Sequence, residues 1–248
     1  QKVIIGIENN KKTAIRTMRE MASGIRECAV SVRSLPSLYP QGGEKVLVYH
    51  TTGRVIPTGK LPIDAGCIVI NCTTLATIGA YLQNGMPLVE KCVTVDGGCV
   101  REPRNVIAPI GTAIRDLFEV CGGLKHEPAK YVYGGPMMGV TVPDDSAPVL
   151  KSSNAVLALT AKESKLPKTT NCIRCGACTN VCPFGLNPAG ISHCVKVGDV
   201  KSLKFLHVDA CMECGCCSYI CPANRPLVQR NQLGKAMLRE EITKEGVK

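Results

Sequence analysis

Three stretches of the sequence together predict an α+β protein built from several domains. An amphipathic segment between two apolar runs occupies residues 3–35, strand-like patterns fill residues 87–159, and eight regularly spaced cysteines lie in residues 172–222. These patterns predict part of a doubly wound α/β domain, a small β-grasp domain and a helical ferredoxin-type domain with two iron-sulfur clusters. A chain of 248 residues has room for two or three such domains.

A β-α-β unit is predicted at the start of the chain. Residues 3–7 and 28–35 are short runs rich in β-branched residues, as in parallel strands covered on both faces. Residues 11–27 place apolar side chains three or four positions apart, which predicts a helix with one apolar face. Those side chains are Ile15, Met18, Ala22 and Ile25.

A glycine-rich turn over residues 39–44 follows, and it could simply join two elements. Residues 44–50 favour a strand by propensity, whereas the glycines on either side, Gly43 and Gly53, could bracket a short helix.

Residues 67–71 predict a buried strand, and Thr73 or Thr74 could cap a helix that ends near residue 84. The uncharged window 65–89 is long enough for a membrane span, but it contains polar residues, proline and three glycines. We therefore expect strand, turn and helix there, and no transmembrane span.

The β-grasp prediction depends on residues 87–159. Residues 89–95 alternate, Asp96-Gly97 is a hairpin signal, and a short apolar run follows at 106–110. Thr112 could cap a helix that Gly122-Gly123 ends. A glycine-rich loop at 134–139, a last strand at 155–159 and a polar linker at 161–170 complete the stretch.

The two cysteine runs repeat the pattern C-x-x-C-x-x-C-x-x-x-C-P. They are Cys172, Cys175, Cys178, Cys182 with Pro183, and Cys211, Cys214, Cys217, Cys221 with Pro222. In such a run, three thiolates bind one [4Fe-4S] cubane and the fourth ligates a neighbouring cubane. We therefore assign one cluster to Cys172, Cys175, Cys178 and Cys221, and the other to Cys211, Cys214, Cys217 and Cys182. Zinc ribbons also use paired C-x-x-C elements, but they need neither the third cysteine nor the proline.

Helices are predicted around the runs, at residues 188–197 and 200–206 and from Pro226 to about residue 241. The four histidines have no partner at metal or triad spacing, so we predict no catalytic acid-base residue.

Eight other cysteines are scattered singly, and we expect most of them to be small buried hydrophobic residues. They are Cys28, Cys67, Cys72, Cys92, Cys99, Cys121, Cys194 and Cys216. Cluster thiolates need reducing conditions, which indicates a cytoplasmic protein.

The formal charge of +10 treats all thiols as neutral. Two bound clusters would lower it to about +6, which suits docking to an acidic protein partner or an undedicated basic surface. A nucleic-acid-binding protein with structural clusters is an alternative motivated by this charge alone, and the scarcity of aromatic residues disfavours it.

Several motifs together resemble the RnfC family, the electron-transfer subunit of membrane-bound Rnf complexes. They are Ile4 to Asn10, the turn from Tyr39 to Glu44, Leu61-Pro62 followed by Asn71, the loop from Gly134 to Gly139, and Cys214 through Tyr219 to Gln229. The resemblance spans nearly the whole chain.

The resemblance implies three domains. Residues 1–86 would be the C-terminal part of a complex-I-type NADH/FMN-binding domain, 87–165 an SLBB-like β-grasp domain with a linker, and 166–248 a helical domain with two [4Fe-4S] clusters. It also implies a helix after Glu44, and it assigns Gly42, Gly43 and Glu44 to the cofactor side. The family's glycine-rich flavin loop precedes the first strand, so we expect this chain, which begins with Gln1, to be a piece of a longer protein.

The function implied by the resemblance is electron transfer between ferredoxin and NAD(H) through flavin and the clusters. The protein would be peripheral, on the cytoplasmic side of the cell membrane, with other Rnf-type subunits and ferredoxin as partners and no nucleic acid. A soluble RnfC-like reductase subunit, serving cobalamin or proline reduction, is an alternative within redox chemistry.

Overall fold

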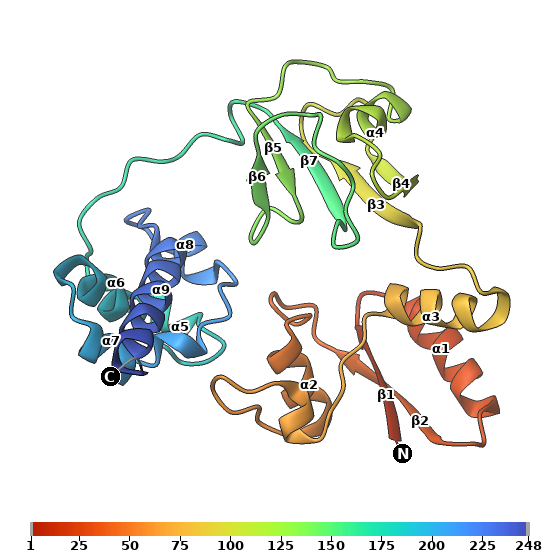
Figure 1. The fold of residues 1–248 in the computed structure, drawn as a ribbon, viewed down its shortest axis with the longest axis horizontal. Helices are drawn as coiled ribbons and strands as arrows, with labels where there is room; N and C mark the ends of the chain where they lie inside the picture. Colours follow the sequence, from red (N-terminus) through yellow and green to blue (C-terminus); the bar gives the residue numbers. More distant parts are fainter. Residues whose placement is uncertain (1, 247–248) are drawn as a thin grey trace. The chain divides into compact units, whose positions relative to one another are not determined.

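A computed structural model describes residues 2–246 (Figure 1). The chain divides into two compact units, one formed by residues up to 70 with 179–212 and those from 230 onward, and the other by 71–178 with 213–229. No helix in the described part of the chain combines the length and the apolar character that a bilayer span requires.

The predicted β-α-β unit is present. Strands β1 (Lys2–Glu8) and β2 (Ala29–Leu35) pair in parallel, with α1 (Lys12–Gly24) between them in the chain. Ile15 is buried as the periodicity predicts, because it lies on the face of α1 that contacts β2. Figure 1 shows α1 running alongside the two strands.

The helix after the glycine-rich turn is α2 (Glu44–Thr52), as the family resemblance implied. Gly43 begins it and Gly53 ends it in the left-handed conformation, with φ 73°. Val46 and Val48 are buried, so the β-branched residues that favour a strand locally serve here as the apolar face of a short helix.

The strand predicted at residues 67–71 is wrong. After the short 3-10 helix η1 (Pro62–Ala65), the chain is extended at Ile68, but it pairs with no strand among the described residues, and Ile68 is 76% exposed. The helix that follows is α3 (Cys72–Asn84), and its cap is Asn71 rather than a threonine, because Asn71 Oδ1 accepts a hydrogen bond from Thr73 N at 2.9 Å. None of the residues of α3 is buried.

A five-stranded mixed sheet of order β4-β3-β7-β5-β6 and helix α4 (Ile114–Val120) form the predicted β-grasp domain. The strands are β3 (Glu90–Asp96), β4 (Arg104–Pro109), β5 (Lys130–Tyr133), β6 (Val140–Val142) and β7 (Ala155–Leu159). Strand β3 pairs antiparallel with β4 and parallel with β7. Figure 1 shows α4 beside the sheet, and the buried Ile114, Leu117 and Phe118 of α4 join its hydrophobic core.

Two local predictions in this domain need correction. Gly97 does not form a two-residue hairpin turn, because a Cβ there would lie 2.3 Å from Ala158 O; the glycine instead lets β7 approach (φ 112°). Thr112 does not cap α4, because its carbonyl accepts a hydrogen bond from Val149 N at 2.7 Å and Ala113 takes the N-cap position.

The remaining elements are the helices of the cysteine-rich region. They are α5 (Ala177–Asn180), α6 (Pro188–Val197), α7 (Val200–Phe205), the 3-10 helix η2 (Val208–Ala210), α8 (Cys216–Tyr219) and α9 (Leu227–Gly246). Asn187 caps α6 and Asp199 caps α7, each accepting a backbone N–H. The three longer helices lie where the sequence predicted them.

Candidate iron-sulfur sites

The two cysteine runs repeat one backbone conformation. The residue before the second cysteine is left-handed in both runs, Arg174 with φ 56° and Glu213 with φ 61°, and so is the following glycine, Gly176 or Gly215. A left-handed residue other than glycine costs about 1–2 kcal/mol, so such residues persist only where the surroundings require them. Turns of this kind aim successive backbone N–H groups into an anion-binding concavity, a form common at iron-sulfur sites.

The segments after the fourth cysteines also match. Gly185 and Asn224 are both left-handed, with φ 62° and 50°, and each lies three residues after the last cysteine of its run. Their N–H groups donate to the carbonyls of Cys182 and Cys221, at 3.1 and 3.0 Å. The sequence repeat is therefore also a repeat of conformation, and the loops fit two copies of the same group.

The start of the first run lies beside the end of the second. Thr170 N donates to Ala223 O at 3.0 Å. Cys178 and Cys221, from different runs, both pack against a small cluster formed by Cys217, Leu227 and Val228. This pairing places Cys221 with the first run, as the crossed assignment requires.

The complementary pairing involves Cys182 and Cys211. Both pack against one hydrophobic cluster, to which Phe184 and Ala210 also contribute contacts. The buried members of this cluster are Leu186, Ile191, Cys194, Val195, Leu203, Val208 and Leu238. The end of the first run thus meets the start of the second, and the crossing is reciprocal.

The two runs differ in exposure. Cys172 and Cys175 are exposed, whereas Cys214 and Cys217 are buried. In the described part of the chain, no three Cys, His, Asp or Glu side chains converge as ligands of one metal ion do. A cubane distributes its thiolates over several irons, so its ligands do not need to meet at one point.

The scattered cysteines follow the prediction in part. Cys99, Cys121, Cys194 and Cys216 are buried, and burial raises the pKa of the Cys99 and Cys121 thiols, which keeps them protonated. Cys72 and Cys92 are exposed, so they are not the small core residues that we expected.

The predicted cofactor-side residues lie at the start of α2. Gly42 is exposed, and nothing lies within 4 Å of the position a Cβ would occupy there. Gly43 is the N-cap of α2, and Glu44 opens its first turn. Neither Gly42 nor Gly43 adopts positive φ, so backbone conformation does not explain these glycines, whereas close approach of a ligand to the backbone would.

Gln41 is a residue of this turn that the sequence did not indicate as functional. It is only 4% exposed, its Oε1 lies 2.9 Å from His50 Nδ1, and its Nε2 has no hydrogen-bond partner within the described residues. A buried amide donor without a partner, next to two glycines, fits a place that a polar cofactor group approaches. Its only sequence signal is a polar residue between Pro40 and Gly42.

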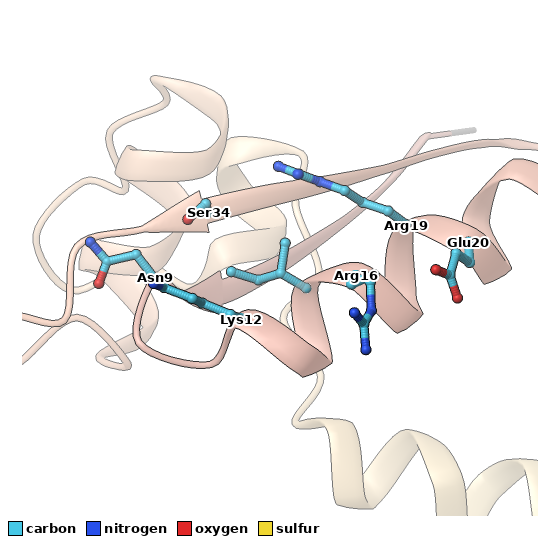
Figure 2. A pocket seen from close by; sticks show the side chains of 7 residues that line it. Asn9, Lys12, Arg16, Arg19, Glu20 and Ser34 are labelled. Atoms are coloured by element: carbon cyan, nitrogen blue, oxygen red, sulfur yellow. The ribbon is translucent and has the colours of Figure 1, made fainter.

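A pocket of about 420 Å³ lies at the carboxyl ends of β1 and β2, where α1 begins. Asn9, Ser34 and three basic residues of α1, Lys12, Arg16 and Arg19, line it. Figure 2 shows that the three basic side chains leave α1 in different directions. The pocket therefore lacks a convergent set of donors for an anion.

Family profiles match three parts of the chain. Residues 1–80 match the Nuo51 FMN-binding domain, 92–141 the SLBB domain and 168–186 the 4Fe-4S binding domain. These matches confirm the predicted fold class, with a flavin-type α/β part, a β-grasp part and an iron-sulfur part in that order. The domain boundaries at residues 86 and 165, and the individual ligands, stay predictions.

Curated relatives are similar over most of this chain, and each is the RnfC-type subunit of its complex. The one from the proton-translocating ferredoxin:NAD(+) oxidoreductase complex of Clostridium ljungdahlii is 41% identical over 192 residues, 77% of this chain and 41% of that protein. Its counterpart in the Na(+)-translocating complex of Acetobacterium woodii is 38% identical over 192 residues, 77% of this chain and 43% of that protein. The counterpart in the ion-translocating oxidoreductase complex of Rhodobacter capsulatus is 39% identical over 245 residues, 99% of this chain and 47% of that protein. The chain thus spans less than half of each relative's length.

A solved structure supports the fold. A chain of the NAD+-reducing [NiFe]-hydrogenase, in its H2-reduced state, superimposes with a TM-score of 0.57 at 15% identity, over 96% of this chain and 49% of that one. Together with the three family profiles and the relatives at 38–41% identity, this likeness confirms the resemblance drawn from the motifs. The chain belongs to the RnfC family, whose members are subunits of ion-translocating oxidoreductase complexes.

Proposed function

We propose that this chain carries electrons through two [4Fe-4S] clusters, between a ferredoxin-side partner and NAD(H) by way of flavin. The observation that carries the proposal is the reciprocal crossing of the cysteine runs, in which Cys178 packs with Cys221 and Cys182 with Cys211. Crossed ligands hold two clusters as neighbours, which is the arrangement that electron transfer needs. A structural zinc site would not need the crossing.

The proposed ligands are those assigned from the sequence. When bound, a cubane accepts and releases one electron at low potential. The protein's part is to hold the thiolates, to direct backbone N–H groups at the sulfurs through the left-handed turns at Arg174 and Glu213, and to limit water access. No side chain of this chain has to make or break a bond to a substrate.

Flavin is proposed to contact the turn that contains Gly42, Gly43 and Glu44. Support comes from the open space at Gly42 and from the unpartnered amide of the buried Gln41. Backbone N–H groups at the start of α2 would stabilise negative charge there. The names of the relatives support ferredoxin and NAD as the redox partners of the complete protein.

The complete protein is proposed to act as a peripheral subunit of a membrane complex that moves protons or sodium ions, on the cytoplasmic side. Support comes from the relatives, which are named as subunits of such complexes. Neighbouring Rnf-type subunits and ferredoxin would then be its protein partners, and the moderate basic charge would suit docking to an acidic one.

The test is anaerobic iron and sulfide analysis, with electron paramagnetic resonance (EPR) on the dithionite-reduced protein. We expect about eight irons per chain and the broadened signals of two interacting reduced cubanes. Stoichiometric zinc without a reducible signal would refute the proposal.

Substitution of one ligand tests the assignment. Cys175→Ser is expected to remove or convert one cluster, which lowers the iron content by about one to four atoms and removes the interaction signal. Cys72→Ser is the matched control, because Cys72 is exposed and lies outside the runs. Eight irons and unchanged spectra in Cys175→Ser would contradict the ligand assignment.

A further inference from the structure

The side chain of Asn231 in α9 contacts one of the proposed ligands. Its Nδ2 donates to Cys211 Sγ at 3.4 Å, and Asn231 is only 1% exposed. Its Oδ1 has no hydrogen-bond partner within the described residues. The contact with sulfur is therefore the one hydrogen bond that those residues give this buried amide.

A neutral thiol is a poor reason to bury an amide. Burying a polar group costs about 1–3 kcal/mol unless it is hydrogen-bonded, and thiol sulfur is a weak acceptor. A thiolate bound to iron carries negative charge, and hydrogen bonds to charged acceptors are roughly twice as strong as neutral ones. The position of Asn231 thus fits a ligated Cys211 better than a free one.

The packing of α9 allows this contact. Gly234, on the next turn, lets the helix approach, because a Cβ there would lie 3.0–3.2 Å from Val195, Leu203 and Val208. Lys235, one turn after Asn231, donates to Cys211 O at 3.1 Å. Two side chains of one helix face thus hold Cys211 by its sulfur and by its backbone.

The first half of the domain lacks an equivalent. Asn231 lies five residues after Pro226, and the residue five positions after Pro188 is His193, which is exposed on α6. The two cysteine loops share a backbone conformation, but only the second has this buried donor. The centres are therefore alike in their loops and different in their surroundings.

We propose that Asn231 is a positioning residue that raises the reduction potential of the centre containing Cys211 and so makes the two centres unequal. Reduction adds negative charge to the cluster and its sulfurs, and an N–H donor stabilises the reduced form more than the oxidised form. The inference deepens the proposed function and depends on it. An electron shared by the pair then resides mainly on the Cys211 centre.

The test is a redox titration followed by EPR on Asn231→Leu, which keeps approximate volume and removes the donor. At a fixed potential, the ratio of reduced to oxidised Cys211 centre is expected to fall about tenfold, a shift of 59 mV for a one-electron couple. The other centre should keep its potential and the iron content should stay at about eight. His193→Leu is the matched control and should change neither potential.

The outcomes separate the inference from the proposed function. Full iron content with both potentials unchanged in Asn231→Leu overturns the role of Asn231 and leaves the electron-transfer proposal intact. No iron and no reducible signal in the unaltered chain refutes both. If Asn231→Leu fails to bind iron, Asn231→Asp keeps the side-chain shape, and an undiminished potential in that variant overturns the inference.

Discussion

Left-handed residues in the cysteine loops are the feature of single residues that most directly reflects function. Arg174, Glu213 and Asn224 adopt positive φ although none is glycine, and each has its repeat partner at the same place in the other half. Strain that recurs at equivalent positions of two loops is explained by a shared ligand rather than by local packing. The side chains differ between the halves, so what is repeated is the direction of the backbone N–H groups.

Arg174 allows a direct test of this backbone requirement. Arg174→Gly should bind iron as fully as the unaltered chain, because glycine adopts positive φ without strain. Arg174→Val should lower iron content after anaerobic reconstitution and destabilise the loaded loop by about 1 kcal/mol or more, since β-branched residues strongly resist this conformation. Iron analysis and thermal unfolding measure both effects.

Ile173→Val is the control for Arg174, because Ile173 is exposed in the same loop without being left-handed. Equal iron binding by the Gly and Val variants of Arg174 would show that the left-handed turn is not needed.

At the scale of single residues, spacing was enough to predict the cysteine runs, because cluster ligation imposes a fixed pattern on sequence. Gln41 and Asn231 could not be predicted in this way. Each matters through burial and an unpartnered amide atom, and both properties arise only when distant parts of the chain pack together.

Helix α9 shows at the scale of elements how packing overrides propensity. Glycine is the poorest helix former after proline, yet Gly234 lies within α9, where Val195, Leu203 and Val208 leave no room for a larger residue.

Gly234→Val is expected to destabilise the protein by about 1–3 kcal/mol despite the better propensity, because it overpacks this contact. Denaturant unfolding followed by circular dichroism measures the change. Leu233→Ala, at a 48% exposed position of the same helix, should change stability by less than about 0.5 kcal/mol. A neutral or stabilising Gly234→Val would show that α9 does not need close packing.

Elements with local stop signals were predicted well, and elements defined by partners were not. Helices α6 and α7 have Pro or Asn or Asp at the start and a glycine between them, so their bounds follow from sequence. Strands β5 and β6 were not predicted, because they are short and depend on pairing with each other and with β7. The apolar segment ending at Asn71 lacks such a partner, and the prediction of a strand there was wrong.

At the scale of the whole molecule, the hydrophobic clusters are separate in sequence. The β-grasp core uses residues between Val93 and Ala158, whereas the clusters around the cysteines use residues from Cys178 to Leu238. No residue of one core belongs to another within the described chain. The β-grasp core should therefore be open to damage without loss of the iron-sulfur centres.

Phe118→Ala tests this independence. Phe118 is 2% exposed and stacks on Tyr131, so truncation should cost the β-grasp domain about 3–5 kcal/mol. Iron content and the EPR signals should stay as in the unaltered chain. Val120→Ala, at an exposed position of the same helix, is the control for stability. Loss of iron in Phe118→Ala, with iron retained in Val120→Ala, would show that the domains fold as one unit.

The reciprocal crossing also bears on what keeps the two halves of the iron-sulfur region connected. With the proposed ligands, Cys182 fastens the first half to the second centre and Cys221 fastens the second half to the first. The bend at Gly198, with φ 76°, lies between the halves, and a break in the chain there would leave the two pieces joined by inorganic staples. The peptide chain and the bound iron are then redundant tethers, and only the loss of both separates the halves.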